Sequence, residues 1–97
     1  MNVSLEWART LRILEITEQQ WSLLLLPKAK EENLITCREI LVIQMRLAII
    51  RTIIETKEEC EEGVVHLHTL IQHIHNLLRD VAMRLRLPIA VVSSDEL

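Results

Sequence analysis

The sequence predicts an all-α domain, a three-helix antiparallel bundle that associates as a helical dimer. Breakers are scarce in the 97 residues, and Pro27, Gly63 and Pro88 divide the chain into segments of helical length. Within these segments, apolar residues recur at spacings of three and four, the period of an amphipathic helix. Hydrophobic residues make up 49% of the chain, more than one copy of a domain this small is expected to bury. We expect a single domain over residues 1–88 and a short tail over 89–97.

The first helix is expected over residues 4–26. Ser4 is a candidate N-cap, with Glu6 in the first turn, where a negative charge favours the helix dipole. One stripe of the helix is apolar, and its members are Trp7, Leu11, Leu14, Trp21 and Leu25. Leu23–Leu26 is apolar all round, which predicts that this end is deeply packed or lies at an interface. Pro27 should end or kink the helix.

A polar connection over 27–33 leads to a second helix, expected over residues 31–57. Asn33 and Pro27 are alternative candidates for its start. The second helix has a heptad seam of Ile40, Ile43, Leu47, Ile50 and Ile54. Further apolar rows leave no wide polar face, so two helices of the same chain cannot easily cover this one. Its β-branched residues also suit a strand, but the length, the helical period and the lack of turn residues favour a helix.

The second helix is expected to end between residues 56 and 63, because glutamates 58–62 would oppose the helix dipole at a C-terminus. A capping-box pattern over 56–59 and a glycine at 63 leave the position of the break open. The third helix, over 64–87, is the most clearly amphipathic of the three. Its apolar arc consists of Leu67, Leu70, Ile71, Ile74, Leu77, Leu78, Val81 and Leu85.

Four histidines flank this arc in two pairs, His66 with His73 and His68 with His75. Each pair is seven residues apart, about 10 Å along a helix, which is too far for two side chains to chelate one ion. Glu62 and His66 do have the four-residue spacing that suits a metal, and Glu58 extends the row if the helix is continuous there. The pattern therefore predicts histidines that border an interface and no metal site, and it leaves their role open.

Composition argues against several classes of function. The net charge is −3, whereas a nucleic-acid binder usually has a basic balance. A single glycine excludes a phosphate-cradling loop, and no serine or cysteine stands near a histidine in a catalytic motif. Cys37 and Cys60 would lie about 35 Å apart if one helix carried both, too far for a disulfide. We therefore expect no enzyme, no catalytic residue and no cofactor.

The chain shows no pattern of a signal peptide or membrane span. Its N-terminal region mixes charged with apolar residues, and the longest apolar stretch, 40–54, is interrupted by Gln44, Arg46 and Arg51. These observations predict an intracellular, soluble protein of the cytoplasm or nucleus.

The function that fits is a non-enzymatic interaction or regulatory protein, acting through self-association or a helical protein partner. The residues expected in the core or the interface are Trp7, Trp21, Ile43, Leu47, Ile50 and Ile54. The alternative is a small helical dimer, of the kind that viral regulators use, bound to the phosphate backbone of duplex RNA or DNA. Arg38, Arg46 and Arg51 are its candidate contacts.

Overall fold

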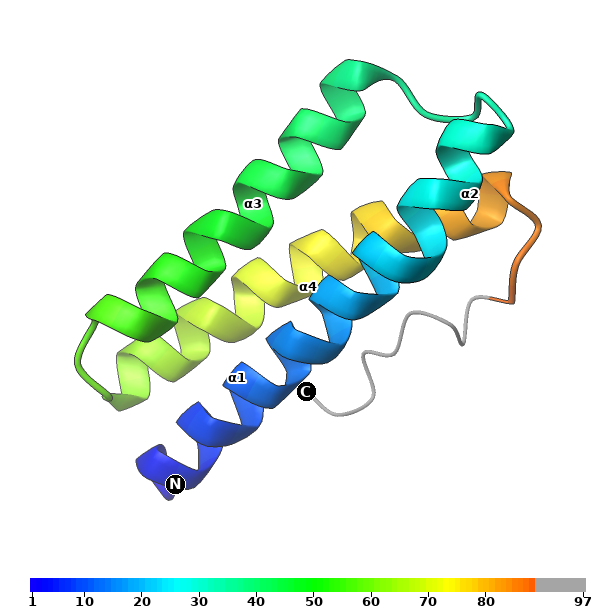
Figure 1. Ribbon diagram of the computed structural model, residues 1–97. Helices are drawn as coiled ribbons and strands as arrows, with labels where there is room; N and C mark the ends of the chain where they lie inside the picture. Colours follow the sequence, from blue (N-terminus) through cyan, green and yellow to red (C-terminus); the bar gives the residue numbers. More distant parts are fainter. Residues whose placement is uncertain (89–97) are drawn as a thin grey trace.

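The computed structural model describes residues 1–88, which form three helical rods and contain no strand. The first rod joins α1 (Val3–Gln19), a π-helical turn η1 (Gln20–Leu25) and α2 (Leu26–Glu31). The second is α3 (Cys37–Thr56) and the third is α4 (Glu61–Arg84). Successive rods run in opposite directions, and each packs on the other two (Figure 1). The all-α prediction is confirmed, association as a dimer stays a prediction, and the tail predicted over 89–97 lies outside the described residues.

The first rod begins at Val3, one residue earlier than the sequence suggests, and it ends later. Asn2, and not Ser4, is its N-cap, with the side-chain oxygen accepting a hydrogen bond from the Leu5 N–H at 3.1 Å. The rod continues to Glu31, past the expected end at residue 26. Pro27 therefore does not end the helix.

The π-helical turn explains how the helix passes Pro27. A proline lacks an N–H and its ring clashes with the carbonyl four residues earlier, so an ordinary helix breaks there. In η1 the N–H of Leu26 bonds to the carbonyl of Trp21, five residues back, which widens the turn just before the proline. The wider turn buries Leu25 completely but leaves Leu23 76% exposed. The apolar run is thus packed on one side only.

Asn33 ends the first rod and does not start the second. Its φ of 56° is left-handed, a conformation that asparagine tolerates, and the next N–H, of Leu34, bonds to the carbonyl of Ala29 at 2.9 Å. α3 then starts at Cys37, later than the predicted residue 31, behind a capping box. Thr36 accepts from the Glu39 N–H at 3.1 Å, and the Glu39 carboxylate accepts from the Thr36 N–H at 3.1 Å.

The second break lies at residues 57–60, inside the predicted window. Its cap is Cys60, whose Sγ accepts from the Gly63 N–H at 3.3 Å, so the pattern over 56–59 is not a capping box. Gly63 lies in the first turn of α4, under the ring of Trp7. A Cβ on Gly63 would meet the Trp7 ring at 2.9 Å, which shows that this glycine makes room for the indole.

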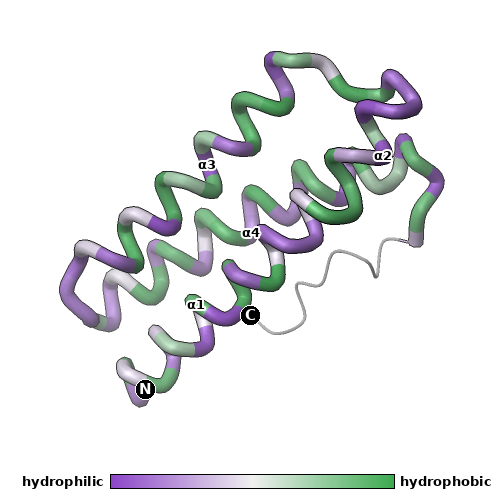
Figure 2. Tube along the Cα trace, in the orientation of Figure 1, coloured by the Kyte–Doolittle hydropathy of each residue, from purple (hydrophilic) through white to green (hydrophobic). Residues whose placement is uncertain are grey.

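The core lies along the axis between the three rods, and Figure 2 shows hydrophobic and hydrophilic residues alternating along each of them. The Trp7 Nε1–H donates to the carbonyl of Ile54 at 3.4 Å and ties α1 to the end of α3. Glu39 and Arg84 join the start of α3 to the end of α4 at 2.6 Å. The apolar arc predicted for the third helix faces inward, with Leu70 and Leu77 half-buried and the other six members buried.

Candidate interaction surface

The core-facing side of α3 is narrow. Its buried residues are Ile43, Leu47, Ile50 and Ile54. At about 100° of rotation per residue, these four positions span an arc of about 60°. α1 and α4 cover that arc and its flanks. Most of the surface of the most apolar helix therefore faces away from the bundle.

The side of α3 opposite the core is an uncharged strip. Leu41, Met45 and Ile49 are 59%, 62% and 51% exposed, and Ala48 and Thr52 are also exposed. We call these five residues the α3 outer strip. A lone exposed apolar residue is ordinary, whereas a row of them along one helix face is a candidate interaction surface.

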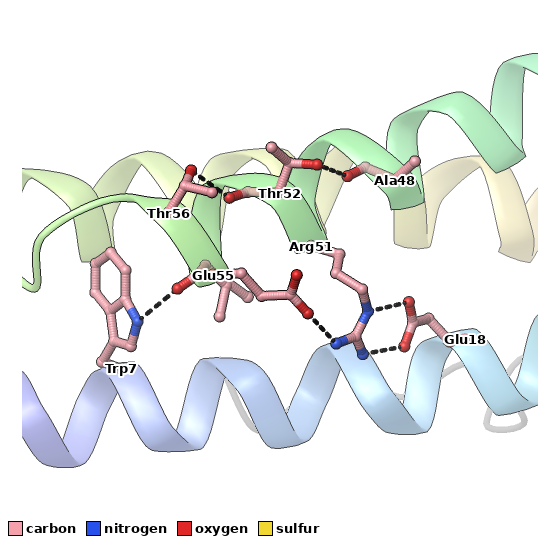
Figure 3. Close-up of polar contacts among 8 residues, drawn as sticks. Trp7, Glu18, Ala48, Arg51, Thr52, Glu55 and Thr56 are labelled. Carbon is pink, nitrogen blue, oxygen red and sulfur yellow. Dashed lines mark hydrogen bonds and ion pairs between the residues drawn. The ribbon is translucent and has the colours of Figure 1, made fainter.

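Two threonines on this side of α3 use their hydroxyl protons within the helix, so they offer no free hydroxyl proton to a partner. The Thr52 hydroxyl donates to the carbonyl of Ala48 at 2.8 Å, and the Thr56 hydroxyl donates to the carbonyl of Thr52 at 2.6 Å (Figure 3). Each hydroxyl hydrogen is thus used within α3 itself. A partner that covers the strip does not leave these hydroxyl protons unsatisfied.

The charges of α3 lie on its flanks, and most are neutralised within the chain. Arg51 faces α1, where its Nε and one terminal nitrogen donate to the Glu18 carboxylate at 2.9 and 2.5 Å (Figure 3). Its other terminal nitrogen donates to Glu55 at 3.0 Å. Hydrogen bonds from Glu18 first and Glu55 second raise the pKa of Arg51 above its ordinary value. The guanidinium is therefore a fixed, compensated charge.

The opposite flank of α3 is tied to α4 in the same way. Arg84 donates to Glu39 and Asp80, and these bonds, led by the one to Glu39, raise its pKa. The pKa of Glu39 is lowered, first by the Thr36 N–H and then by Arg84. A small pocket of about 150 Å³ opens beside this ion pair, with an apolar floor that includes Val42. Of the four charged residues that line it among residues 1–88, Glu39, Asp80 and Arg84 bond to one another, which leaves Arg38 as the one charge without an ion-pair partner.

The three arginines proposed for phosphate contact do not share one surface. Arg51 is held on the α1 side by Glu18, while Arg38 lines the pocket on the α4 side. Arg46 is exposed, and the helical rotation between it and Arg51 is about 140°. Within residues 1–88, only Arg38 and Arg46 of the three lack an ion-pair partner. The helix therefore offers no continuous basic row.

The histidine pairs divide between the interior and the surface. His68 Nε2 lies 3.3 Å from Thr10 Oγ1 and His75 Nε2 lies 2.9 Å from Thr17 Oγ1, so two threonine–histidine contacts repeat at seven-residue spacing between α1 and α4. His66 and the other member of its pair are exposed. Among residues 1–88, no three metal-binding side chains gather, so Glu62 and His66 have no third ligand.

His75 is the one buried histidine of the described chain. The Thr17 hydroxyl donates to the carbonyl of Ile13 at 2.8 Å, so its oxygen accepts the proton on His75 Nε2. Nδ1 is then an unprotonated acceptor, and it has no hydrogen-bond partner within residues 1–88. Burial, and secondly the charge of Arg79, lower the pKa of His75 to about 4.

The six residues predicted for the core or the interface all lie in the core of the single chain, each 7% exposed or less. The apolar residues of α3 that are more than half exposed are different ones, namely Leu41, Met45 and Ile49 of the outer strip. The sequence did hold a signal for them, because apolar rows outside the heptad seam contain Leu41, Ala48 and Ile49. The periodicity alone did not say which row faces the core.

The described residues contain no helix with both the length and the apolar character that crossing a membrane requires. Known proteins add nothing to the surface just described, since no family model, no curated protein and no solved structure matches this chain.

Proposed function

We propose that this chain is a non-enzymatic interaction protein with a regulatory role, and that it acts by binding a second copy of itself through the α3 outer strip. The observation behind the proposal is the uncharged face of α3. From Leu41 to Thr52 no charged side chain faces directly away from the core, and three large apolar side chains are more than half exposed.

The strip is small for a stable interface, and this sets the expected affinity. The twelve helical residues from Leu41 to Thr52 extend about 18 Å, so a strip about 10 Å wide has an area of about 180 Å² per copy. Stable interfaces usually bury about 800 Å² per partner. We expect a weak, concentration-dependent dimer and not a permanent one.

The test is the mass of the purified chain, by light scattering or sedimentation, from about 1 μM to about 1 mM. The mass should rise towards that of a dimer, and Met45→Glu should hold the chain monomeric. Met83→Glu is the matched control, because Met83 on α4 is 60% exposed and Met45 is 62% exposed. A wild-type chain that stays monomeric at the highest concentration contradicts the proposal, as does an equal effect of the two substitutions.

The same experiment weighs the nucleic-acid alternative. Two observations disfavour it: Arg51 is already bound by two carboxylates, and Glu39 lies beside Arg38. We expect no change in mass when a short RNA or DNA duplex is added. A gain in mass that is reversed by salt, and reduced by Arg46→Ala, would favour duplex binding instead.

A further inference from the structure

Charge is distributed unevenly along the edge of the bundle that α3 forms. At its C-terminal end and just beyond it, residues 55–62 contain five glutamates and one lysine, a formal charge of −4. The connection between α3 and α4 is hydrophilic in Figure 2. At the N-terminal end, Arg38 is exposed and has no ion-pair partner within residues 1–88. The two ends lie about 30 Å apart, so each can meet a different part of a partner.

This difference in charge between the two ends of α3 favours one orientation of two paired copies. In a parallel pair, the two clusters of −4 would lie beside each other, and like charges at an interface rim disfavour association. In an antiparallel pair, the acidic end of each copy meets the end with Arg38 of the other. We propose that two copies pair through the α3 outer strip in antiparallel, two-fold symmetric fashion. This inference rests on the proposed function and adds the orientation of the pair.

The register of the strip fits a two-fold axis between Ala48 and Ile49. About that axis Met45 lies opposite Thr52, and Leu41 lies opposite Thr56. Met45 and Leu41 then each meet a threonine whose hydroxyl proton is already bonded within its own helix, and Ile49 meets Ala48. The small side chain of Ala48 lies near the axis, where the two helices come closest. A two-fold contact repeats each of these pairs twice.

Arg38 takes part in the same register. It lies opposite Glu58 and Glu59 of the other copy, at the rim of the strip. Glu59 already accepts a hydrogen bond from Ser4 at 3.0 Å, whereas Glu58 has no ion-pair partner within residues 1–88. Glu58 is thus the carboxylate best placed to receive the guanidinium.

The two native cysteines report the orientation directly. Both are exposed, and they lie at opposite ends of α3, too far apart for a short bismaleimide to join within one chain. In the antiparallel pair, Cys37 of each copy lies near Cys60 of the other. In a parallel pair each cysteine lies near its own counterpart. Serine retains the capping role of Cys60, because its hydroxyl also accepts the Gly63 N–H.

The decisive experiment compares full-length chains cross-linked with a short, flexible bismaleimide. We expect the wild type and an equimolar mixture of Cys37→Ser and Cys60→Ser to give covalent dimers, and each variant alone to give none. A covalent dimer from either variant alone would overturn the antiparallel pair. If that happens while Met45→Glu still abolishes the dimer, self-association stands and only its orientation is wrong; a chain that never dimerises refutes both.

Charge reversal gives a second, independent readout. Arg38→Glu and Glu58→Arg, each alone, should weaken dimerisation by roughly threefold to tenfold, because each places two like-charge contacts at the rim. A mixture of the two variants should bind more tightly than either variant alone, since both contacts between positions 38 and 58 in the mixed dimer again join opposite charges. Helical circular dichroism confirms that both variants fold. A mixture no tighter than its components would overturn the pairing of these residues.

Discussion

Acidification from pH 8 to pH 5 is expected to remove about 2 kcal/mol from the free energy of unfolding through His75 alone. Its pKa is about 4 in the folded chain and 6.5 as the ordinary value, so the unfolded chain binds the proton more tightly. A lowered histidine pKa leaves stability unaffected above pH 6.5, and stability is lost as the pH falls from there towards 4. At about 1.4 kcal/mol per pKa unit, the full loss is about 3 kcal/mol, of which about 2 kcal/mol has occurred at pH 5.

The assay is thermal or urea unfolding at pH 8 and pH 5, at one protein concentration, for the wild type and His75→Gln. Glutamine stays neutral, and its amide N–H can still donate to Thr17. The wild type should lose roughly 8–16 °C more in Tm than the variant over this range. Carboxylates titrate in both proteins, so the difference between them isolates the histidine. Equal pH dependence in the two proteins would refute the reasoning, because it would mean that His75 accepts its proton without penalty.

Three further substitutions test individual contacts. Thr36→Ala removes the cap of α3 and should lower the free energy of unfolding by about 1 kcal/mol in urea titrations; no change would mean that the capping box contributes nothing. Gly63→Ala gains about 1 kcal/mol of helix propensity but forces a methyl group against Trp7, so stability should fall, and a more stable variant would contradict the close packing. Arg51 and Glu18 are about one-third exposed, so a double-mutant cycle with Arg51→Met and Glu18→Gln should give a coupling below about 1 kcal/mol, and a value well above this would show a less hydrated pair.

The sequence predicted the helices well where burial is periodic. The arc of the third helix and the seam containing Ile43 and Ile50 face the core, because apolar spacing of three and four leaves a helix little choice of packing face. The sequence did not indicate which apolar row of α3 would be exposed. The residues of the exposed row are as apolar as those of the seam, and only the positions of α1 and α4 decide which row is covered.

Helix ends were less predictable than helix faces. The sequence offers several threonine–glutamate and asparagine patterns, and the one that forms depends on the tertiary path of the chain. Thr36 caps α3, and its partner Glu39 is also bound by Arg84 from the far end of α4, a contact that the local sequence does not disclose. Gly63 looked like a helix terminator, yet it provides space for Trp7, a contact between residues 56 positions apart in the chain.

The positions of the charged residues on α3 distinguish a helix whose outer face binds a second copy from a helix whose outer face is only exposed to water. Met45 and Ile49 are both more than half exposed, so a helix that only faces water could hold lysine at either position at little cost to the core. The charges of α3 instead lie on its flanks and at its ends. We therefore expect Ile49→Lys to change the free energy of unfolding by no more than about 0.5 kcal/mol in dilute solution, while it abolishes the rise in mass with concentration. A large loss of stability in a dilute, monomeric sample would show instead that the outer strip supports the fold of the single chain, and the argument for a second copy would lose its basis.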